Sequence, residues 1–398
     1  MSYLSFLNNC CILRLMAKEK AVVIIPTYNE RENIGRMIEV LEKEIFPQIK
    51  DWEMAILVVD DHSPDGTAEI VREKMKDYTN IELSLGEKQG LGAAYARGMK
   101  YAMEKMNADW VIEFDADFQH DPAYIPQLLN AARQGYDYVV GSRYVPGGKV
   151  PQDWNFSRRL ISSLGSFVAR FVFFFPFEFK NAPRDLTSGL KATKVKGFLE
   201  KIDLDHLLSK GYAYKIEIFY RMVKLGAKVK EIPIEFKNRE KGESKMPPKN
   251  LTDSLKVVIK LRLQDEKTQS FLKFAVVGFV GYLVNALSLA LFTSFSWPEV
   301  LCWLLSTELA IISNFTWNNL WTFAKEKFTK PSLVLKKFLQ FNLTSAGALV
   351  IQTVMGTLLT SLFGPEYRQL YLPLIIVFMV LPYNWLMYNR VIWKKKTS

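Results

Sequence analysis

The sequence predicts an α/β domain with a mostly parallel, doubly wound sheet, followed by a four-helix transmembrane domain. Up to about residue 267, continuous apolar runs alternate with segments of helical periodicity, which is typical of strands buried on both faces of a sheet. After residue 270, long apolar runs are broken only by short polar loops. A chain of 398 residues is long enough for both domains.

Composition limits the choice of partner and compartment. The formal net charge of +11 indicates an anionic partner, and the long apolar runs favour a membrane surface over nucleic acid. The three cysteines form no CxxC pair, which favours a reducing, cytosolic environment. Residues 1–20 are expected to be an N-terminal extension rather than a signal peptide, because they lack a basic start and a cleavage site.

The first domain, residues 21–250, can be followed strand by strand. Apolar runs predict buried strands, and a run containing Pro233 predicts a last strand at the sheet edge. The predicted strands are residues 21–25, 55–59, 81–85, 110–114, 138–140 and 232–236. Helices are expected after the first four of these, near residues 34, 67, 91 and 122. The polar segments 185–189 and 211–217 are expected to precede further helices.

Polar clusters stand at the ends of four predicted strands. These clusters are Pro26–Glu30, Asp60 with Asp61, Asp115–Gln119, and Arg143. In a doubly wound sheet, ligands bind in the crevice outside the carboxyl ends of the strands. The agreement of four strand ends therefore predicts one binding crevice at that edge.

The segment after residue 114 carries the candidate metal ligands Asp115, Asp117 and Gln119. Two carboxylates and an amide form a hard oxygen set that suits Mg²⁺ or Mn²⁺ shared with a substrate diphosphate. The alternative is a solvated turn between strand and helix, since Asp-x-Asp is short and common. Asp121 is expected to cap the following helix, with Pro122 as its first residue.

Gly90 and Gly92 look like the start of the dinucleotide-binding motif GxGxxG. Tyr95, however, stands where the third glycine belongs, and the motif does not directly follow a buried strand. These differences argue against a nicotinamide-dependent dehydrogenase. Close backbone packing at the start of a helix explains the two glycines better.

Two amphipathic segments are expected to hold the first domain against a bilayer. Residues 157–175 carry one apolar stripe with arginines elsewhere, which predicts an interfacial helix; a buried core helix is the alternative. Residues 251–267 form a second candidate helix and linker. There, Leu255, Val258 and Ile259 are expected to face one way and lysines the other.

The second domain, residues 268–398, contains four apolar runs, each long enough to cross ~30 Å of hydrocarbon at ~1.5 Å per residue. The predicted spans are about residues 271–295, 300–321, 338–363 and 370–388. Lysines gather between the second and third spans and after the fourth, while the other connections carry almost none. The positive-inside rule therefore places these loops and the first domain in the cytoplasm.

The combined motifs resemble those of the dolichol-phosphate mannose synthases, which are inverting glycosyltransferases with the A-type fold. The matching segments are Pro26–Asn33, Asp60–Thr67, Gly90–Tyr95, Asp115–Asp117, Gly141–Tyr144 and Arg239–Lys245. They cover roughly residues 21–245, and together they are highly specific. The second domain resembles, on hydropathy, the small four-helix domain attached to some members.

The resemblance implies GDP-mannose as donor, Mg²⁺ or Mn²⁺, and dolichyl or another polyprenyl phosphate as acceptor. It implies catalytic roles for Asp117 and Arg143, and a basic loop that closes on phosphates. The implied nucleotide-sugar-binding residues are Pro26, Tyr28, Glu30, Val59, Asp61, Asp115, Ala116, Asp117, Arg143, Arg239 and Lys245. The alternatives are transfer of glucose or another hexose to a polyprenyl phosphate, or a lipid-linked sugar flippase or scaffold.

Overall fold

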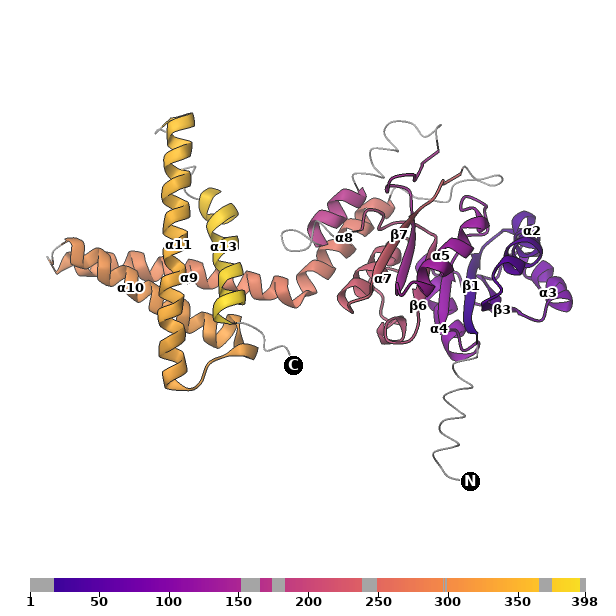
Figure 1. Cartoon of the computed structure of the whole chain (residues 1–398), viewed down its shortest axis with the longest axis horizontal. Helices are drawn as coiled ribbons and strands as arrows, with labels where there is room; N and C mark the ends of the chain where they lie inside the picture. The colour runs from indigo at the N-terminus through magenta and orange to yellow at the C-terminus, as the bar shows by residue number, and fades with distance from the viewer. Residues whose placement is uncertain are drawn as a thin grey trace, which may run out of the picture. The chain divides into compact units, whose positions relative to one another are not determined.

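A computed structural model of the 398-residue chain describes residues 18–151, 165–173, 183–237, 249–295, 297, 299–364 and 374–393. The chain forms two compact units, which divide between Arg262 and Leu263 (Figure 1).

The first unit is organised around a seven-stranded sheet. Its strands are β1 (Glu19–Thr27), β2 (Trp52–Asp60), β3 (Ile81–Leu85), β4 (Trp110–Glu113), β5 (Tyr138–Ser142), β6 (Lys191–Lys194) and β7 (Val229–Pro233). The order across the sheet is β3-β2-β1-β4-β6-β5-β7, and β6 runs antiparallel to both of its neighbours, while the other pairs are parallel. The mostly parallel sheet is therefore confirmed. Strands β2 and β3 are added on one side of β1 and β4 on the other, so the order of the strands switches between β1 and β4.

Two strand assignments need correction. The polar segment 185–189 precedes β6 rather than a helix; the sequence Lys191–Lys194 has a lysine at each end and carries no apolar run. The last strand lies at residues 229–233 rather than 232–236, because its pairing with β5 begins at Tyr138 and Val229. Its position at the sheet edge is as predicted, and Pro233, which cannot donate a ladder hydrogen bond, is its final residue.

Helices cover both faces of the sheet. They are α2 (Arg31–Val40), α3 (Thr67–Asp77), α4 (Leu91–Glu104), α5 (Ile125–Arg133), α7 (Tyr214–Lys224) and α8 (Lys249–Gln264). Side chains of α4, α7 and α8 share one buried apolar cluster, and those of α2, α3 and α5 share the other. This two-layered covering is the doubly wound arrangement that the sequence predicted.

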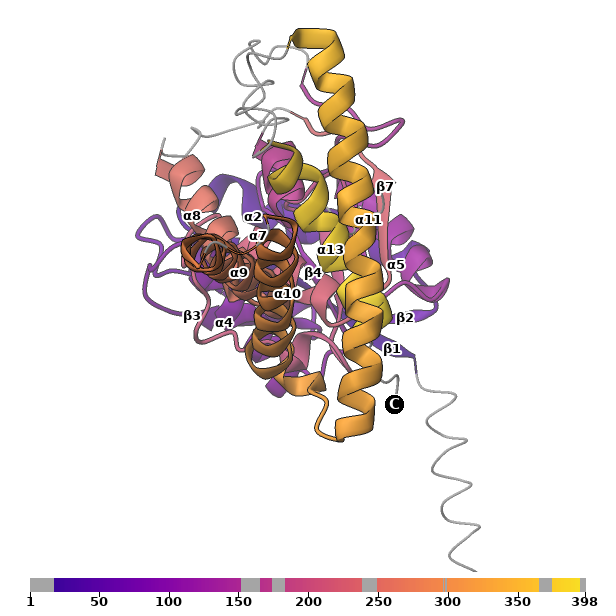
Figure 2. The same cartoon turned by 90° about the vertical axis from the view of Figure 1, so that its left-hand side faces the viewer.

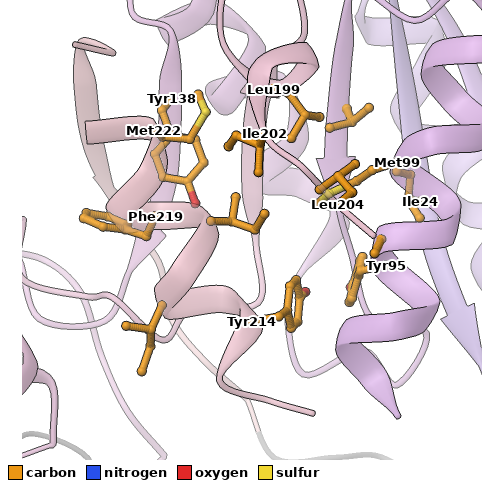
Figure 3. Packing of buried hydrophobic residues seen from close by; sticks show 14 of the residues in the cluster. Ile24, Tyr95, Met99, Tyr138, Leu199, Ile202, Leu204, Tyr214, Phe219 and Met222 are labelled. Atoms are coloured by element: carbon orange, nitrogen blue, oxygen red, sulfur yellow. The ribbon is translucent and has the colours of Figure 1, made fainter. Parts of the chain in front are cut away.

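The core on the α4–α7 face reaches the predicted crevice. Figure 3 shows Tyr95 of α4 and Tyr214 of α7 near each other, and their rings stack with centroids 5.2 Å apart. Met99 and Phe219 continue the same fully buried layer away from them. Each such side chain stabilises the fold by roughly 1.5–3 kcal/mol when it leaves water. The layer thereby fixes α4 and α7 against the sheet beneath the site.

The two amphipathic segments divide their apolar residues between core and surface. In residues 165–173 the side chains of Ala169 and Phe173 are buried, while Phe167 and Phe171 are exposed by 51% and 43%. The remainder of the predicted helix at 157–175 lies outside the described residues. Arg262 of α8 donates a 3.1 Å hydrogen bond to the carbonyl oxygen of Phe173, which ties the two segments together.

Helix α8 has two apolar faces. Val257, Val258 and Leu261 are buried in the core, whereas Leu255 and Ile259 are exposed by 46% and 45%. The prediction that Val258 shares a face with Leu255 is therefore wrong. A helix that both packs on a domain and presents apolar residues outward spreads them around more of its circumference than a simple amphipathic helix does.

The second unit consists of long helices. These are α9 (Glu266–Ser294), α10 (Glu299–Trp317), α11 (Pro331–Phe363) and α13 (Leu381–Met387), which is extended by π-helical turns at Ile376–Val380 and Tyr388–Ile392. Helix α10 packs along α9, and α13 packs along α11 (Figures 1 and 2). These helical segments overlap the predicted spans, and residues 370–373 of the fourth predicted span lie outside the described residues. Within the described residues, the segment Glu266–Phe292 is long and apolar enough to cross a membrane.

Candidate active site

The carboxyl ends of β1 and β2 lie side by side, as predicted. Pro26 pairs with Val59 and Thr27 with Asp60 in the parallel ladder. The Thr27 hydroxyl donates a 2.9 Å hydrogen bond to Asp60 Oδ2, and the amide of Asp61 donates one of 3.1 Å to the Thr27 carbonyl oxygen. The strand ends are thus joined by side-chain and backbone contacts.

The two adjacent aspartates have different environments. Asp60 is fully buried and accepts hydrogen bonds from the amide and the hydroxyl of Ser63, at 2.9 and 2.6 Å. Asp61 forms a 2.6 Å ion pair with Arg97. Burial raises the pKa of Asp61, and Arg97 opposes that shift. Asp60 therefore holds the turn together, and Asp61, paired with a cation, is the aspartate that the resemblance assigns to the nucleotide.

The turn after β1 is tied to the turn after β2. The amide of Asn29, which has a positive φ of 55°, donates to the hydroxyl of Ser63, and the amide of Glu30 donates to the hydroxyl of Thr67. The Lys88 ammonium lies 3.2 Å from the centroid of the Tyr28 ring, a cation–π contact. These contacts gather the predicted nucleotide-binding residues of both turns at one edge.

Val59, unlike the other residues predicted to bind the nucleotide sugar in these turns, has an apolar side chain that is buried in the core. Its side chain is fully buried in the apolar cluster that also holds α4. A valine in that position offers a ligand only its backbone. The prediction that Val59 binds the nucleotide sugar is compatible with a backbone contact at the end of β2.

The acidic turn follows β4 directly. The Asp115 side chain is 28% exposed and accepts a 2.9 Å hydrogen bond from the hydroxyl of Tyr95. Asp117 is 5% exposed, and its Oδ1 accepts a 3.1 Å hydrogen bond from the amide of Gln119. Between them Ala116 is buried, and Phe118 has a left-handed φ of 58° that turns the chain.

The start of the next helix is as predicted. The Asp121 side chain accepts a 3.0 Å hydrogen bond from the amide of Ala123, and Pro122 is the first residue of a short 3₁₀ turn that leads into α5. This cap satisfies one of the amides that a helix start leaves without an intrahelical partner. The acidic turn is therefore held at both ends, by β4 and by the capped turn.

The donor set at this turn fits a shared metal ion. Within the described residues, no three His, Cys, Asp or Glu side chains form a complete metal cage. Mg²⁺ typically takes one or two protein carboxylates and completes its octahedron with water and substrate phosphates. Asp115 and Asp117 supply such a pair. The amide nitrogen of the Gln119 side chain lies 3.5 Å from the carbonyl oxygen of Lys237, so Gln119 also contacts the segment after β7.

Two lysines are buried beneath the acidic turn. Lys215 Nζ lies 3.8 Å from Asp115 Oδ2, and its side chain is 2% exposed. Lys191 is fully buried and donates a 3.2 Å hydrogen bond to the Lys215 carbonyl oxygen. Burial lowers the pKa of Lys191 to about 8. Burial also works against the charge of Lys215, but Asp115 and other neighbours leave its pKa raised.

Gly189 allows Lys215 and Asp115 to meet. A Cβ at this position would lie 2.8 Å from Asp115 Oδ2 and 2.9 Å from Lys215 Nζ. It would also lie 2.8 Å from Cε1 of His120, a buried ring packed edge-on against Phe236. Burial lowers the pKa of His120 to about 3, so its imidazole is neutral near neutral pH. Any larger residue at 189 would force this cluster apart.

Arg143 is held by a buried carboxylate. Its Nε and Nη2 each donate a 2.8 Å hydrogen bond to Asp185, and Nη2 donates another of 2.8 Å to the Thr187 hydroxyl. Burial opposes both charges, but their attraction lowers the pKa of Asp185 and raises that of Arg143. The structure thus assigns Arg143 an internal partner that the sequence did not predict. Arg239 and Lys245 lie outside the described residues.

Gly90 and Gly92 serve close packing, as predicted. A Cβ on Gly90, whose φ is +115°, would lie 2.6 Å from the Lys210 carbonyl oxygen. A Cβ on Gly92 would lie 2.7 Å from the carbonyl oxygen of Gly211. The glycines let the start of α4 approach the segment that leads into α7. Tyr95, which breaks the dinucleotide motif, is the residue that hydrogen-bonds Asp115.

Comparison with known proteins places the chain among membrane-linked sugar transferases. A family model described as "Glycosyl transferase family 2" matches residues 22–198, and one described as "GtrA/DPMS, transmembrane domain" matches residues 273–393. Dolichol-phosphate mannosyltransferase of Pyrococcus furiosus is 34% identical over 84% of this chain and 89% of that one. Polyprenol monophosphomannose synthase of Mycolicibacterium smegmatis is 37% identical over 60% of this chain and 84% of that one.

Proposed function

The chain belongs to the polyprenyl-phosphate mannosyltransferases of glycosyl transferase family 2, and we propose that it transfers mannose from GDP-mannose to dolichyl or a related polyprenyl phosphate. The observation that carries the proposal is the acidic turn of Asp115 and Asp117 at the end of β4. It lies where the strand order reverses, beside the joined ends of β1 and β2. Ligands of doubly wound sheets bind at such a reversal.

In this proposal the two turns after β1 and β2 hold the nucleotide. Tyr28, Glu30 and Asp61 bind the base and ribose, with the backbone near Pro26 and Val59 alongside. Asp115, Ala116 and Asp117 face the diphosphate. Asp115 and Asp117, with Gln119, hold Mg²⁺ or Mn²⁺, which supplies Lewis-acid stabilisation of the charge that builds up on the leaving GDP.

The proposed reaction is a single displacement at C1 of mannose. An oxygen of the lipid phosphate forms a bond to C1 while the bond from C1 to the GDP oxygen breaks, and that electron pair leaves with GDP. Attack from the opposite face inverts the configuration. A phosphate monoester has its second pKa near ~6, so the nucleophile is already anionic near neutral pH. The neutral, buried His120 is therefore not needed as a general base.

The main task of the protein is to bring two anions together. Arg143, Arg239 and Lys245 are proposed to neutralise the reacting phosphates, as cationic side chains do in phosphate sites. In Arg143, Nε and Nη2 already donate to Asp185 and Thr187, so its phosphate contact would be made through Nη1. Arg143 is oriented for this by its bond to Asp185. The bond fixes the direction of the side chain before any ligand arrives.

The proposed acceptor is a membrane lipid, and two features of the chain support contact with a bilayer. The exposed residues Phe167, Phe171, Leu255 and Ile259 are proposed to rest in the interfacial region of the bilayer. The second unit, matched by a transmembrane-domain model, is proposed to cross the bilayer with four spans. The first unit is proposed to lie on the cytoplasmic side, which the lysine-rich loops support through the positive-inside rule.

The test is a transfer assay on the purified full chain in detergent. It combines dolichyl phosphate, Mn²⁺ and either radiolabelled GDP-mannose or radiolabelled UDP-glucose, with and without EDTA. The proposal expects label from GDP-mannose to enter the organic phase and EDTA to abolish the transfer. Transfer from UDP-glucose but not from GDP-mannose would show that the transferred sugar is glucose rather than mannose. An unchanged function in the Asp117→Asn variant would favour the scaffold alternative over an enzyme.

A further inference from the structure

The carboxylate of Asp115, one of the two proposed metal ligands, has a buried cationic neighbour. Lys215 Nζ lies 3.8 Å from Asp115 Oδ2, and the lysine side chain is only 2% exposed. Its stem starts in the first turn of α7, and Gly189 leaves the space that its ammonium fills. The ammonium group therefore cannot swing out to solvent when another cation approaches Asp115.

Neighbouring charges are already committed to other partners. The cations Lys191, Lys215 and Arg143 lie among the carboxylates of Glu113, Asp115, Asp117 and Asp185. Arg143 is bound to Asp185 by two hydrogen bonds, and Glu113 accepts a 2.6 Å hydrogen bond from the Tyr214 hydroxyl. Lys215 is the cation that these contacts direct to Asp115. The cluster therefore approaches charge balance before any ligand binds.

We propose that Lys215 is a positioning residue that weakens binding of a divalent cation to the nucleotide-free site, so that the metal ion is held tightly only together with a diphosphate. Two cations on one partly buried carboxylate repel each other, and the burial of Lys215 limits how far solvent screens that repulsion. A diphosphate supplies the negative charge that offsets both of them. This inference rests on the proposed function, because it needs the metal and the nucleotide at Asp115.

The repulsion at Asp115 couples the binding of the metal ion to the binding of the diphosphate. If the diphosphate raises the affinity for the metal, the metal must raise the affinity for the diphosphate by the same factor. Replacing Lys215 with a neutral residue of similar length should reduce this factor, because the empty site would then accept the cation without repulsion. Tyr95 offers a matched contrast, since it also contacts Asp115 but carries no charge.

The experiment measures Mn²⁺ binding to the full chain in detergent by the electron paramagnetic resonance signal of free Mn²⁺, with and without GDP. In the wild-type protein, GDP should tighten Mn²⁺ binding at least ~10-fold. In Lys215→Met, binding without GDP should tighten by roughly tenfold and the effect of GDP should shrink. In Tyr95→Phe, binding without GDP should not tighten.

The variants separate charge from structural support. If Lys215 merely supports Asp115, then Lys215→Met and Tyr95→Phe will both weaken Mn²⁺ binding, and the proposal is overturned. Circular dichroism checks that each variant is folded, and Lys215→Gln replaces the methionine variant if that one unfolds. If the wild-type protein binds Mn²⁺ in the presence of GDP but Lys215→Met does not bind Mn²⁺ more tightly without GDP, the role of Lys215 is contradicted while the proposed metal site stands. Wild-type protein that binds no Mn²⁺ with GDP defeats the proposed metal site as well.

Discussion

Arg143 and Asp185 form a bidentate ion pair in which both hydrogen bonds measure 2.8 Å and both side chains are almost fully buried. The pair joins the end of β5 to the segment before β6, and the Arg143 amide also donates to Asp185 at 3.1 Å. A buried pair of this kind need not stabilise more than apolar residues would, but breaking it leaves one charge without compensation. It therefore fixes the geometry of this part of the site.

Asp185→Asn should destabilise the protein strongly. The substitution removes one charge and leaves the Arg143 guanidinium buried, which typically costs about 3–5 kcal/mol. The measurement is the thermal unfolding midpoint of the full chain in detergent. Asp205→Asn is the matched control, because Asp205 pairs with Lys100 at the surface and its side chain is 64% exposed. Equal midpoints for the two variants would contradict the structural role of the buried pair.

Arg143→Lys should lower turnover by at least about tenfold although it conserves charge. Lysine presents a point charge and cannot donate the two parallel hydrogen bonds that Asp185 accepts, so the side chain loses its fixed direction. Steady-state transfer assays with saturating donor measure the effect. Turnover equal to that of the wild type would show that transfer does not depend on the bidentate contact between Arg143 and Asp185.

Gly189→Ala should impair the site without unfolding the sheet. The added methyl group would lie 2.8 Å from Asp115 Oδ2 and 2.9 Å from Lys215 Nζ, so one of these groups must move. We expect transfer activity to fall at least about tenfold, since small displacements of ligating groups are costly in catalysis. Gly211→Ala is the control, because its methyl group would meet only Ser209 Oγ at 3.7 Å. Similar activities in both variants would contradict the steric argument.

The titration of Lys191 should increase the free energy of unfolding as the pH rises from about 8 to about 10.4. Burial lowers its pKa to about 8 in the folded protein, whereas an unfolded lysine titrates near ~10.4. Between these values the unfolded chain binds more protons, so the free energy of unfolding increases with pH, by roughly 3 kcal/mol in total. Below pH 8 both states carry the charge and the full cost of burying it remains.

Lys191→Met should lack this increase. Denaturant unfolding of the full chain, followed by tryptophan fluorescence at several pH values, gives the difference between variant and wild type. The advantage of the variant should shrink as the pH rises from 8 to about 10.4. Lys194→Met serves as the control because the Lys194 side chain is 37% exposed. A difference that stays constant with pH would show that Lys191 titrates normally.

Phe171→Ser and Ile259→Ser should raise the KM for the lipid acceptor and leave the KM for the donor unchanged. Both side chains are exposed, by 43% and 45%, so their loss removes little from the core. Transfer assays with the acceptor in phospholipid vesicles measure both constants. An effect on the donor constant alone would place these residues away from the bilayer.

The strands that sequence reasoning located were those with a strong local signal. Continuous apolar runs predicted β1, β2, β4 and β5, because strands buried on both faces need no polar alternation. Strand β6 gave no such signal: Lys191 and Thr193 are buried there and interact with residues distant in the sequence. Its existence depends on tertiary pairing with β4 and β5 rather than on its own composition.

The candidate site shows the same division. Asp115 and Asp117 were predictable, since they follow a strand end and have a recognisable spacing. Lys215 and Tyr95 were not, because their relation to Asp115 depends on how α4 and α7 pack on the sheet. The sequence identifies residues 211–217 as a polar segment, but no local signal predicts that Lys215 is buried beside the carboxylate of Asp115.

The reversed direction of β6 has a consequence for how this enzyme can diversify. Because β6 begins beside Glu113, at the carboxyl end of β4, the stretch 143–190 leaves and rejoins the sheet at the same edge. Its two ends are clasped by Arg143 and Asp185. Because both ends of this stretch are fixed at one edge of the sheet, its length and sequence can change without altering the strand order. Changes in the length or sequence of this stretch would then leave Arg143 and Asp185 in place.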